Sequence, residues 1–126
     1  MIDILLNISS FLLDSFKHQA TMDNMKNENV QEALFNIGDL LESLAEDLES
    51  DVYPHSKCAQ MELLSKNLAE ALEDDLDEHY LEILKNNLNS AVEIEKLYAY
   101  KDDPTQIQKI KVTAGYFKAA AILSHI

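Results

Sequence analysis

The chain has 126 residues, 47% of them hydrophobic, and a formal net charge of −13 at pH 7. This length fits a single domain over residues 1–126, and the excess of acid disfavours binding to nucleic acids or to anionic membrane surfaces. With two Gly, two Pro and no alternating β-branched or aromatic run, the sequence predicts an all-α fold, an up-and-down bundle of four to five helices with short connections.

The single cysteine, Cys58, excludes an internal disulfide and is compatible with a reducing cytoplasm, the location that we expect. The apolar segment Met1–Phe16 lacks the basic region of a signal peptide and carries Asp3 in its place. No stretch is long and apolar enough to predict a transmembrane helix.

A first helix is predicted from Asp3 to His18. Its apolar residues cover more than one stripe; they include Ile4, Leu5, Ile8, Phe11, Leu12 and Phe16. A helix that is apolar on most sides must be buried on most sides. It could enter the bundle of its own chain or pack against a second copy, and because the domain is small we favour a homodimer formed through the first and last helices.

The second predicted helix has the clearest pattern in the chain. Its apolar residues alternate in steps of four and three and form a seam for a neighbouring helix, namely Val30, Leu34, Ile37, Leu41, Leu44 and Leu48. Asn29 and Glu32 have the spacing of a capping box at its start. Gly38 lies beside the seam, where it could allow a second helix to approach closely, at a cost of about 1 kcal/mol in helix propensity.

A third helix is predicted from Pro54 to Glu73, because proline is favoured at the first helical position. Its inward residues would be Met61, Leu64, Leu68 and Leu72. Asp75 and Glu78 resemble a cap for a further helix that reaches Tyr100. No Gly or Pro separates these two helices, so one long helix from Pro54 to Tyr100 is an open alternative.

The last helix is predicted to start at Pro104, with Asp103 as its N-cap and Gln106 as its third residue. Ile107, Ile110, Ala114 and Phe117 would face the core, followed by an apolar tail with Ile122, Leu123 and Ile126. The aromatic residues Tyr98, Tyr100, Tyr116 and Phe117 could form a binding surface, but helical spacing favours core packing for them.

Acidic residues are concentrated in the middle of the chain, where sixteen Asp or Glu and two lysines lie between Glu28 and Glu82. This charge favours a partner with a basic surface. We therefore expect a small, non-enzymatic interaction or regulatory protein, such as an adaptor, an inhibitor or an immunity-type protein, without a cofactor. Its expected partner-binding residues are Glu42, Glu46, Glu49, Glu70, Glu73, Asp74, Asp77 and Glu78.

The alternative is an enzyme that binds Mg²⁺. Glu46-x-x-Glu49 and Glu70-x-x-Glu73 place two acidic pairs at helical spacing. This spacing resembles that of all-α nucleotide pyrophosphohydrolases of the MazG and dimeric dUTPase kind, and the resemblance implies Mg²⁺ held by these four carboxylates. Those enzymes end the second pair in Asp, where this chain has Glu73, although Asp74 and Asp77 offer a shifted pair. Glu46 and Glu49 are expected on the outer face of their helix, whereas bundle metal sites use inward carboxylates.

His55 and Cys58 are three residues apart and could both reach one Zn²⁺, with His79 further along the chain. Because a structural zinc site needs four ligands, this set is incomplete. Whether Cys58 is a reactive thiol is not decided by the sequence.

Overall fold

The computed structural model describes residues 2–17, 28–73, 78–86 and 96–125. The helices are α1 (Ile2–Lys17), α2 (Glu28–Glu49), α3 (His55–Ala71), α4 (Glu78–Asn86) and α6 (Pro104–His125), with one further helical turn at 96–98. No strand occurs in these described ranges. The predicted all-α bundle is confirmed.

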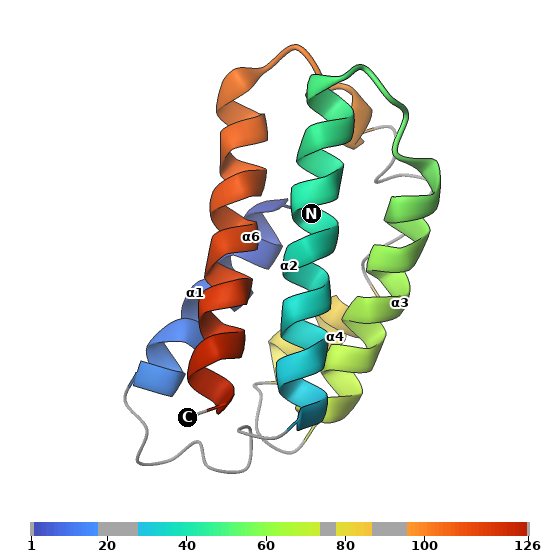
Figure 1. Ribbon diagram of the computed structural model, residues 1–126. Coiled ribbons are helices and arrows are strands. Elements are labelled where there is room, and N and C mark those ends of the chain that lie inside the picture. Colours follow the sequence, from blue (N-terminus) through green and yellow to red (C-terminus); the bar gives the residue numbers. More distant parts are fainter. Residues whose placement is uncertain (1, 18–27, 74–77, 87–95, 126) are drawn as a thin grey trace.

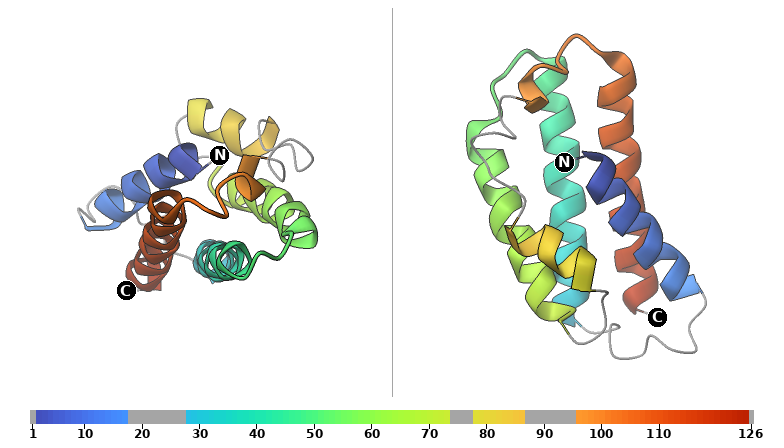
Figure 2. Two further views of the ribbon diagram at one scale, coloured as in Figure 1. Left: turned by 90° about the horizontal axis from the view of Figure 1, so that it is seen from above. Right: turned by 180° about the vertical axis from the view of Figure 1, so that it is seen from behind.

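α2 is the central helix of the bundle. It lies beside α6 along most of its length and has α3 on its other side (Figure 1). Both neighbours run antiparallel to α2. α1 packs against α6 and α4 packs against α3, which places these two helices behind the other three (Figure 2).

The core consists of the apolar stripes that the helical periodicity predicts. All six seam residues of α2, from Val30 to Leu48, are fully or almost fully buried, as are Met61, Leu68, Ile110 and Phe117. Leu64 is an exception, because it is only partly buried at the edge of the core. Ile122, in the apolar tail of α6, is 61% exposed.

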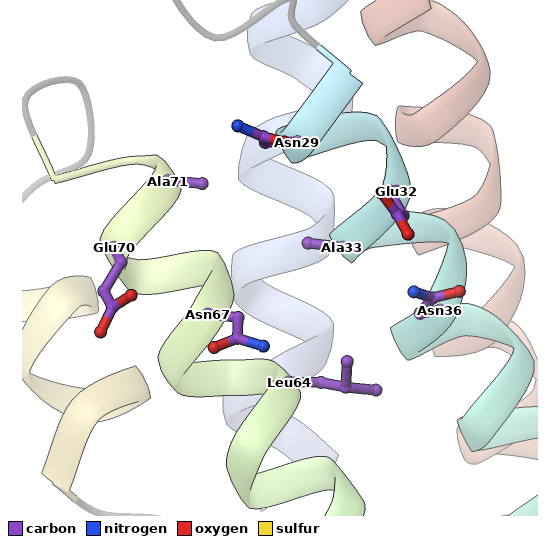
Figure 3. Close-up of a pocket in the computed structure, with 8 residues that line it drawn as sticks. All are labelled: Asn29, Glu32, Ala33, Asn36, Leu64, Asn67, Glu70 and Ala71. Atoms are coloured by element: carbon purple, nitrogen blue, oxygen red, sulfur yellow. The ribbon is translucent and has the colours of Figure 1, made fainter.

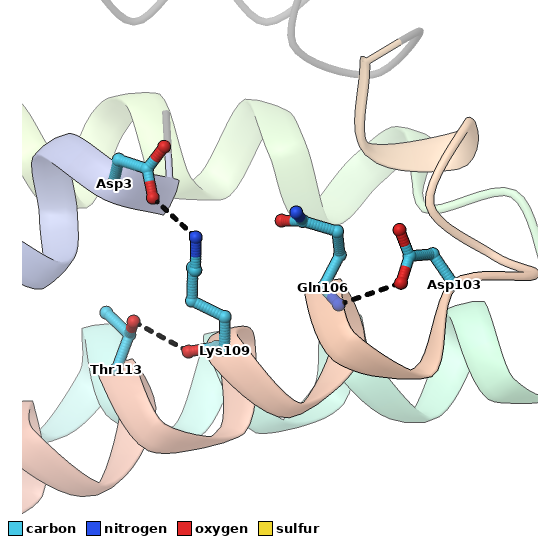
Figure 4. Close-up of polar contacts among 5 residues, drawn as sticks. All are labelled: Asp3, Asp103, Gln106, Lys109 and Thr113. Carbon is cyan, nitrogen blue, oxygen red and sulfur yellow. Dashed lines mark hydrogen bonds and ion pairs between the residues drawn. The ribbon is translucent and has the colours of Figure 1, made fainter.

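α1 buries its apolar residues within its own chain. Leu5, Ile8 and Leu12 are fully buried, and α6 is the helix against which α1 packs. The ring of Phe11 lies 5.5 Å from that of Tyr80. Near the start of α1, Lys109 Nζ of α6 lies 2.9 Å from Asp3 Oδ1 (Figure 4). α1 therefore packs into the bundle of its own chain, which is the first of the two arrangements predicted for it.

The predicted start of α6 is confirmed by its hydrogen bonds. The backbone N–H of Gln106 donates to Asp103 Oδ1 at 3.3 Å (Figure 4), and the backbone N–H of Thr105 donates to the same oxygen at 3.0 Å. Asp103 thereby satisfies two of the backbone donors that a helix leaves unpaired at its first turn.

Two predicted helix starts are displaced by one or two residues, and one open alternative is excluded. α2 begins at Glu28, so Asn29 lies inside its first turn instead of capping it. α3 begins at His55, with Pro54 in the N-cap position. The single long helix from Pro54 to Tyr100 does not occur, because α3 ends at Ala71 in a turn and α4 starts at Glu78. Local propensity alone does not fix the first residue of α2 or of α3 to within one residue.

The C-terminus of α2 ends in a Schellman motif with an aspartate where glycine is usual. Asp51 has a φ of 55°. The N–H of Val52 donates to Asp47 O at 2.7 Å, and the N–H of Asp51 donates to Leu48 O at 3.3 Å. The Asp51 carboxylate accepts hydrogen bonds from Tyr98 Oη (2.9 Å) and Lys101 Nζ (3.1 Å), which joins this turn to the segment before α6.

Candidate partner-binding groove

The acidic row of α2 faces the lysines of α6. Glu42, Glu46 and Glu49 are exposed and share one side of α2, because they are four and three residues apart. Lys111 forms an ion pair with Glu49. Lys118 Nζ lies 2.9 Å from both Glu42 Oε1 and Asp39 Oδ1.

These ion pairs change the expected role of the row. The hydrogen bonds from Lys118 to Glu42 and then Asp39 raise the pKa of the Lys118 ammonium group above its ordinary value. Glu46 is the exposed member of the row that forms no ion pair with a side chain in the described part of the chain. Two of the three acidic residues of this row, Glu42 and Glu49, thus contribute to the contact between α2 and α6.

On its other side, α2 forms a groove with α3. One cavity of about 490 Å³ is lined by four residues from each helix (Figure 3): Asn29, Glu32, Ala33 and Asn36 of α2, and Leu64, Asn67, Glu70 and Ala71 of α3. A second cavity of about 420 Å³ shares Asn36 and Leu64 with the first and extends to Ser43. From Asn29 to Ser43 the groove follows α2 for about 21 Å, at 1.5 Å per residue.

The chemistry of the groove is amphipathic. Leu64 and Ala71 project from α3 towards α2 and, with Ala33, form an apolar floor (Figure 3). Amide side chains come from both walls, as Asn36 from α2 and Asn67 from α3. In the second cavity the floor continues with Leu40, and Leu63 lies at the rim with 61% of its surface exposed.

The electrostatics of the groove are acidic. Glu32 contributes a carboxylate from the α2 wall and Glu70 one from the α3 wall, and none of the described lining residues is basic. Within the described residues neither glutamate forms an ion pair. The groove therefore presents negative charge over an apolar floor.

The expected partner-binding residues do not share one surface. Glu70 lines the groove, and Glu73 and Glu78 are exposed between α3 and α4. Glu42, Glu46 and Glu49 lie on the α6 side of α2 instead. Asp74 and Asp77 lie outside the described residues.

The four carboxylates of the Mg²⁺ alternative are also separated. Glu70 lies across the groove from Glu32, and Glu46 is fourteen residues further along α2, about 21 Å away along the helix axis. In the described ranges, no group of three or more His, Cys, Asp or Glu side chains could hold one metal ion. The side chains of His55 and Cys58, the zinc alternative, lie outside the described residues.

Sequence reasoning missed most of the groove, namely Asn29, Glu32, Asn36 and Asn67. One signal could have indicated it: Asn29 and Asn36 are seven residues apart, so they repeat on one side of α2 next to the apolar seam. Two amides and a glutamate on that flank are consistent with a helix face that a neighbour covers only in part.

None of the helices in the described ranges is long and apolar enough to cross a membrane. The chain was compared with protein-family models, with curated proteins and with solved structures, and no match was found in any of the three.

Proposed function

We propose that this protein is a non-enzymatic interaction or regulatory protein that binds a basic protein partner in the groove between α2 and α3. The observation that carries the proposal is that Glu32 and Glu70 line the groove from opposite helices and form no ion pair with a described side chain. An adaptor, an inhibitor or an immunity-type protein would all act through such a surface.

The partner chemistry follows from the groove. A segment that carries Lys or Arg would neutralise Glu32 and Glu70, and its apolar side chains would cover Leu64 and Leu40. Charge attraction of this kind accelerates encounter and weakens as salt rises, whereas apolar burial supplies affinity that salt does not screen. A groove of about 21 Å accommodates roughly four turns of a bound helix.

The proposal moves the binding surface away from Glu42 and Glu49. Their carboxylates already have ammonium partners on α6, so a basic ligand would have to displace Lys118 and Lys111. Of the expected residues Glu70 lines the proposed groove, together with Glu32, whereas Glu73 and Glu78 are exposed at the end of α3 and the start of α4 and line neither cavity. The proposal also includes two expectations from the sequence, self-association through the apolar first and last helices and a cytoplasmic location.

Affinity capture from cell extract tests the proposal at low and high salt, with bound proteins identified by mass spectrometry. We expect basic proteins to bind the wild type at low salt and to be lost at high salt. The double variant Glu32→Gln with Glu70→Gln should lose the same proteins.

The matched control is Asp14→Asn with Asp102→Asn, which also removes two negative charges, from exposed positions elsewhere on the surface. This control should retain the captured proteins. Direct titration with the captured protein that the groove variant loses most should show weaker binding to the groove variant than to the wild type and the control. Equal loss in both double variants would mean that net charge, and not the groove, attracts the ligands. Retention of the captured proteins by both double variants would exclude the groove as their binding site.

A further inference from the structure

The residues that line the groove between α2 and α3 form rows with a spacing of seven residues. Each row keeps one kind of side chain, which is polar and uncharged, aliphatic or acidic, except the row of Leu63 and Glu70. On α2 the rows are Asn29, Asn36 and Ser43, then Ala33 and Leu40, then Glu32 and Asp39; on α3 they are Gln60 and Asn67, then Leu64 and Ala71, then Leu63 and Glu70. The lining therefore repeats in residue type as well as in position.

This repeat suits a helical ligand. Seven residues of a helix rise about 10.5 Å, so each wall of the groove presents the same kind of side chain at that interval. A third helix returns the same side to the groove after seven residues and stays in register with both walls. An extended segment directs every second side chain to the groove, about 6.7 Å apart, and loses register over the same length.

The unpaired acids of the groove lie at one of its ends. Glu32 is in the second turn of α2 and Glu70 is in the last turn of α3, which runs antiparallel to α2. Neither forms an ion pair with a described side chain. Asp39 lines the groove further along α2, but its Oδ1 lies 2.9 Å from Lys118 Nζ of α6. A cationic group of a ligand is therefore favoured at the end of the groove near Glu32 and Glu70.

A lysine of the chain itself occupies the other end. Lys57 Nζ lies 2.7 Å from Asp47 Oδ2 and donates to the carbonyl oxygen of Ser43 at 3.4 Å. Ser43 lines the second cavity, so a second cation that approached this end would meet a neutralised carboxylate and an ammonium group. Between the two ends the groove is apolar, and Leu40 lies eight residues from Glu32, about 12 Å along the helix axis.

We propose that the ligand of the groove is an amphipathic helix with heptad-spaced apolar side chains and with its Lys or Arg residues confined to the end that meets Glu32 and Glu70. Its apolar side would cover Ala33, Leu40 and Leu64, so that the basic end and the apolar anchor over Leu40 are about two helical turns apart. This inference rests on the proposed function, and it specifies the conformation and the charge pattern of the partner segment.

Fluorescence anisotropy with three synthetic peptides of equal composition tests the inference. Each peptide has about 18 residues, which exceeds the length of the groove in helical form. The first carries leucines at heptad spacing and its lysines in the last turn, where lysine also favours the helix. The second keeps the leucines and spreads the lysines along the outward side. The third keeps the lysines at the end and places the leucines at alternate residues. We expect the first peptide to bind the wild type at least fivefold more tightly than either of the others.

The double variant Glu32→Gln with Glu70→Gln should remove the preference, so that the first and second peptides bind within twofold of each other. The helicity of the free peptides is the same for every protein variant, so this change reports the groove and not the peptides. Asp14→Asn with Asp102→Asn, which removes two charges from exposed positions elsewhere, should retain the preference.

The apolar part of the contact is tested at the rim. Leu63→Asn should weaken binding of the first peptide at least threefold without a change in circular dichroism, because 61% of this side chain is exposed. The matched control is Ile122→Asn on α6, where the exposed fraction is also 61%. It should leave the affinity for the peptide unchanged.

Equal affinities of the wild type for the three peptides would overturn the inference, as would a preference that persists in the double variant of Glu32 and Glu70. It would also be overturned by a wild type that binds none of the peptides, including one that instead forms a dimer sensitive to Leu63→Asn. Equal loss of affinity in Leu63→Asn and Ile122→Asn would place the peptide outside the groove.

The two proposals fail separately. If the double variant of Glu32 and Glu70 loses the captured basic proteins while the wild type does not discriminate among the peptides, the groove remains a site for a basic partner and the helical ligand is excluded. If the peptide preference is found but the captured proteins are retained by that variant, the groove binds such a helix and the captured proteins bind elsewhere.

Discussion

The two sides of α2 make contacts of opposite character. Towards α6 the helices approach closely at Gly38, where an added Cβ would also lie 3.1 Å from Ala114 O, and lysines of α6 neutralise the acids of α2. Towards α3 the helices leave a groove, Leu64 is only partly buried, and Glu32 and Glu70 have no described cation partner. The close contact of α2 thus lies on its α6 side, and its α3 side lines the groove that we propose as the binding site.

The difference shows that the neighbouring helix decides whether an acidic residue of α2 is ion-paired. The number of acidic residues on α2 does not decide it. The α2 acids Glu42 and Glu32 are both exposed and lie ten residues apart. Glu42 pairs with Lys118 of α6, whereas Glu32 lines the groove and pairs with no described lysine; the lysine of α3 that reaches α2 is Lys57, which pairs with Asp47 at 2.7 Å. The same residue type is therefore ion-paired at one position and has no described ion pair at the other.

The largest expected effect is a core truncation on the α6 side. Phe117 is fully buried, so Phe117→Ala should lower the free energy of unfolding by about 3–5 kcal/mol through lost burial and the cavity left behind. Leu64→Ala on the groove side should cost about 1 kcal/mol, because only part of that side chain leaves water on folding. Denaturant unfolding measures both. Comparable losses would mean that the α3 side is packed as tightly as the α6 side.

The two glycines give a smaller effect of opposite sign. Gly38→Leu should lower the free energy of unfolding by about 1–3 kcal/mol, since the new side chain must displace Lys118 from its carboxylates. Gly115→Ala should raise it by up to about 1 kcal/mol, because the site is open and alanine favours the helix. Thermal unfolding at a concentration where the chain is monomeric measures both changes. A loss at Gly115 would show that the open site carries a contact within the chain.

The buried stripes were the most predictable part of the fold. The four-three spacing from Val30 to Leu48 fixes which side of α2 is apolar, and that side is buried as predicted. The N-cap at Asp103 was equally predictable, because the aspartate, the proline and the glutamine each occupy a helix-start position that favours their residue type. Gly38 was also predicted as a site of close helix approach.

Other features depend on information that periodicity does not contain. The spacing of Glu42, Glu46 and Glu49 indicates a shared face, but not that α6 would bring Lys111 and Lys118 to it. The groove requires α2 and α3 to diverge, and no local signal reports the distance between two helices. Tyr116, which is 37% exposed, was assigned to the core together with Phe117 on helical spacing, although one residue along a helix turns the side chain by about 100°.

The smallest expected effect concerns Asp51, which joins the end of α2 to the segment before α6. The hydrogen bond from Tyr98, and then the hydrogen bond and charge of Lys101, hold the pKa of the Asp51 carboxyl below its ordinary value of 3.8. A carboxyl whose pKa is lowered in the folded state contributes stability above its unfolded pKa and loses it as the pH falls through the folded value. Asp51→Asn should therefore lower the melting temperature at neutral pH and have no effect in strong acid. Asparagine tolerates the positive φ of 55°, so the backbone of the turn is retained. Asp14→Asn, at an exposed site with no such hydrogen bonds, is the control and should follow the wild-type curve. A constant offset between Asp51→Asn and the wild type at every pH would show that the turn conformation, and not the charge, sets the contribution of Asp51.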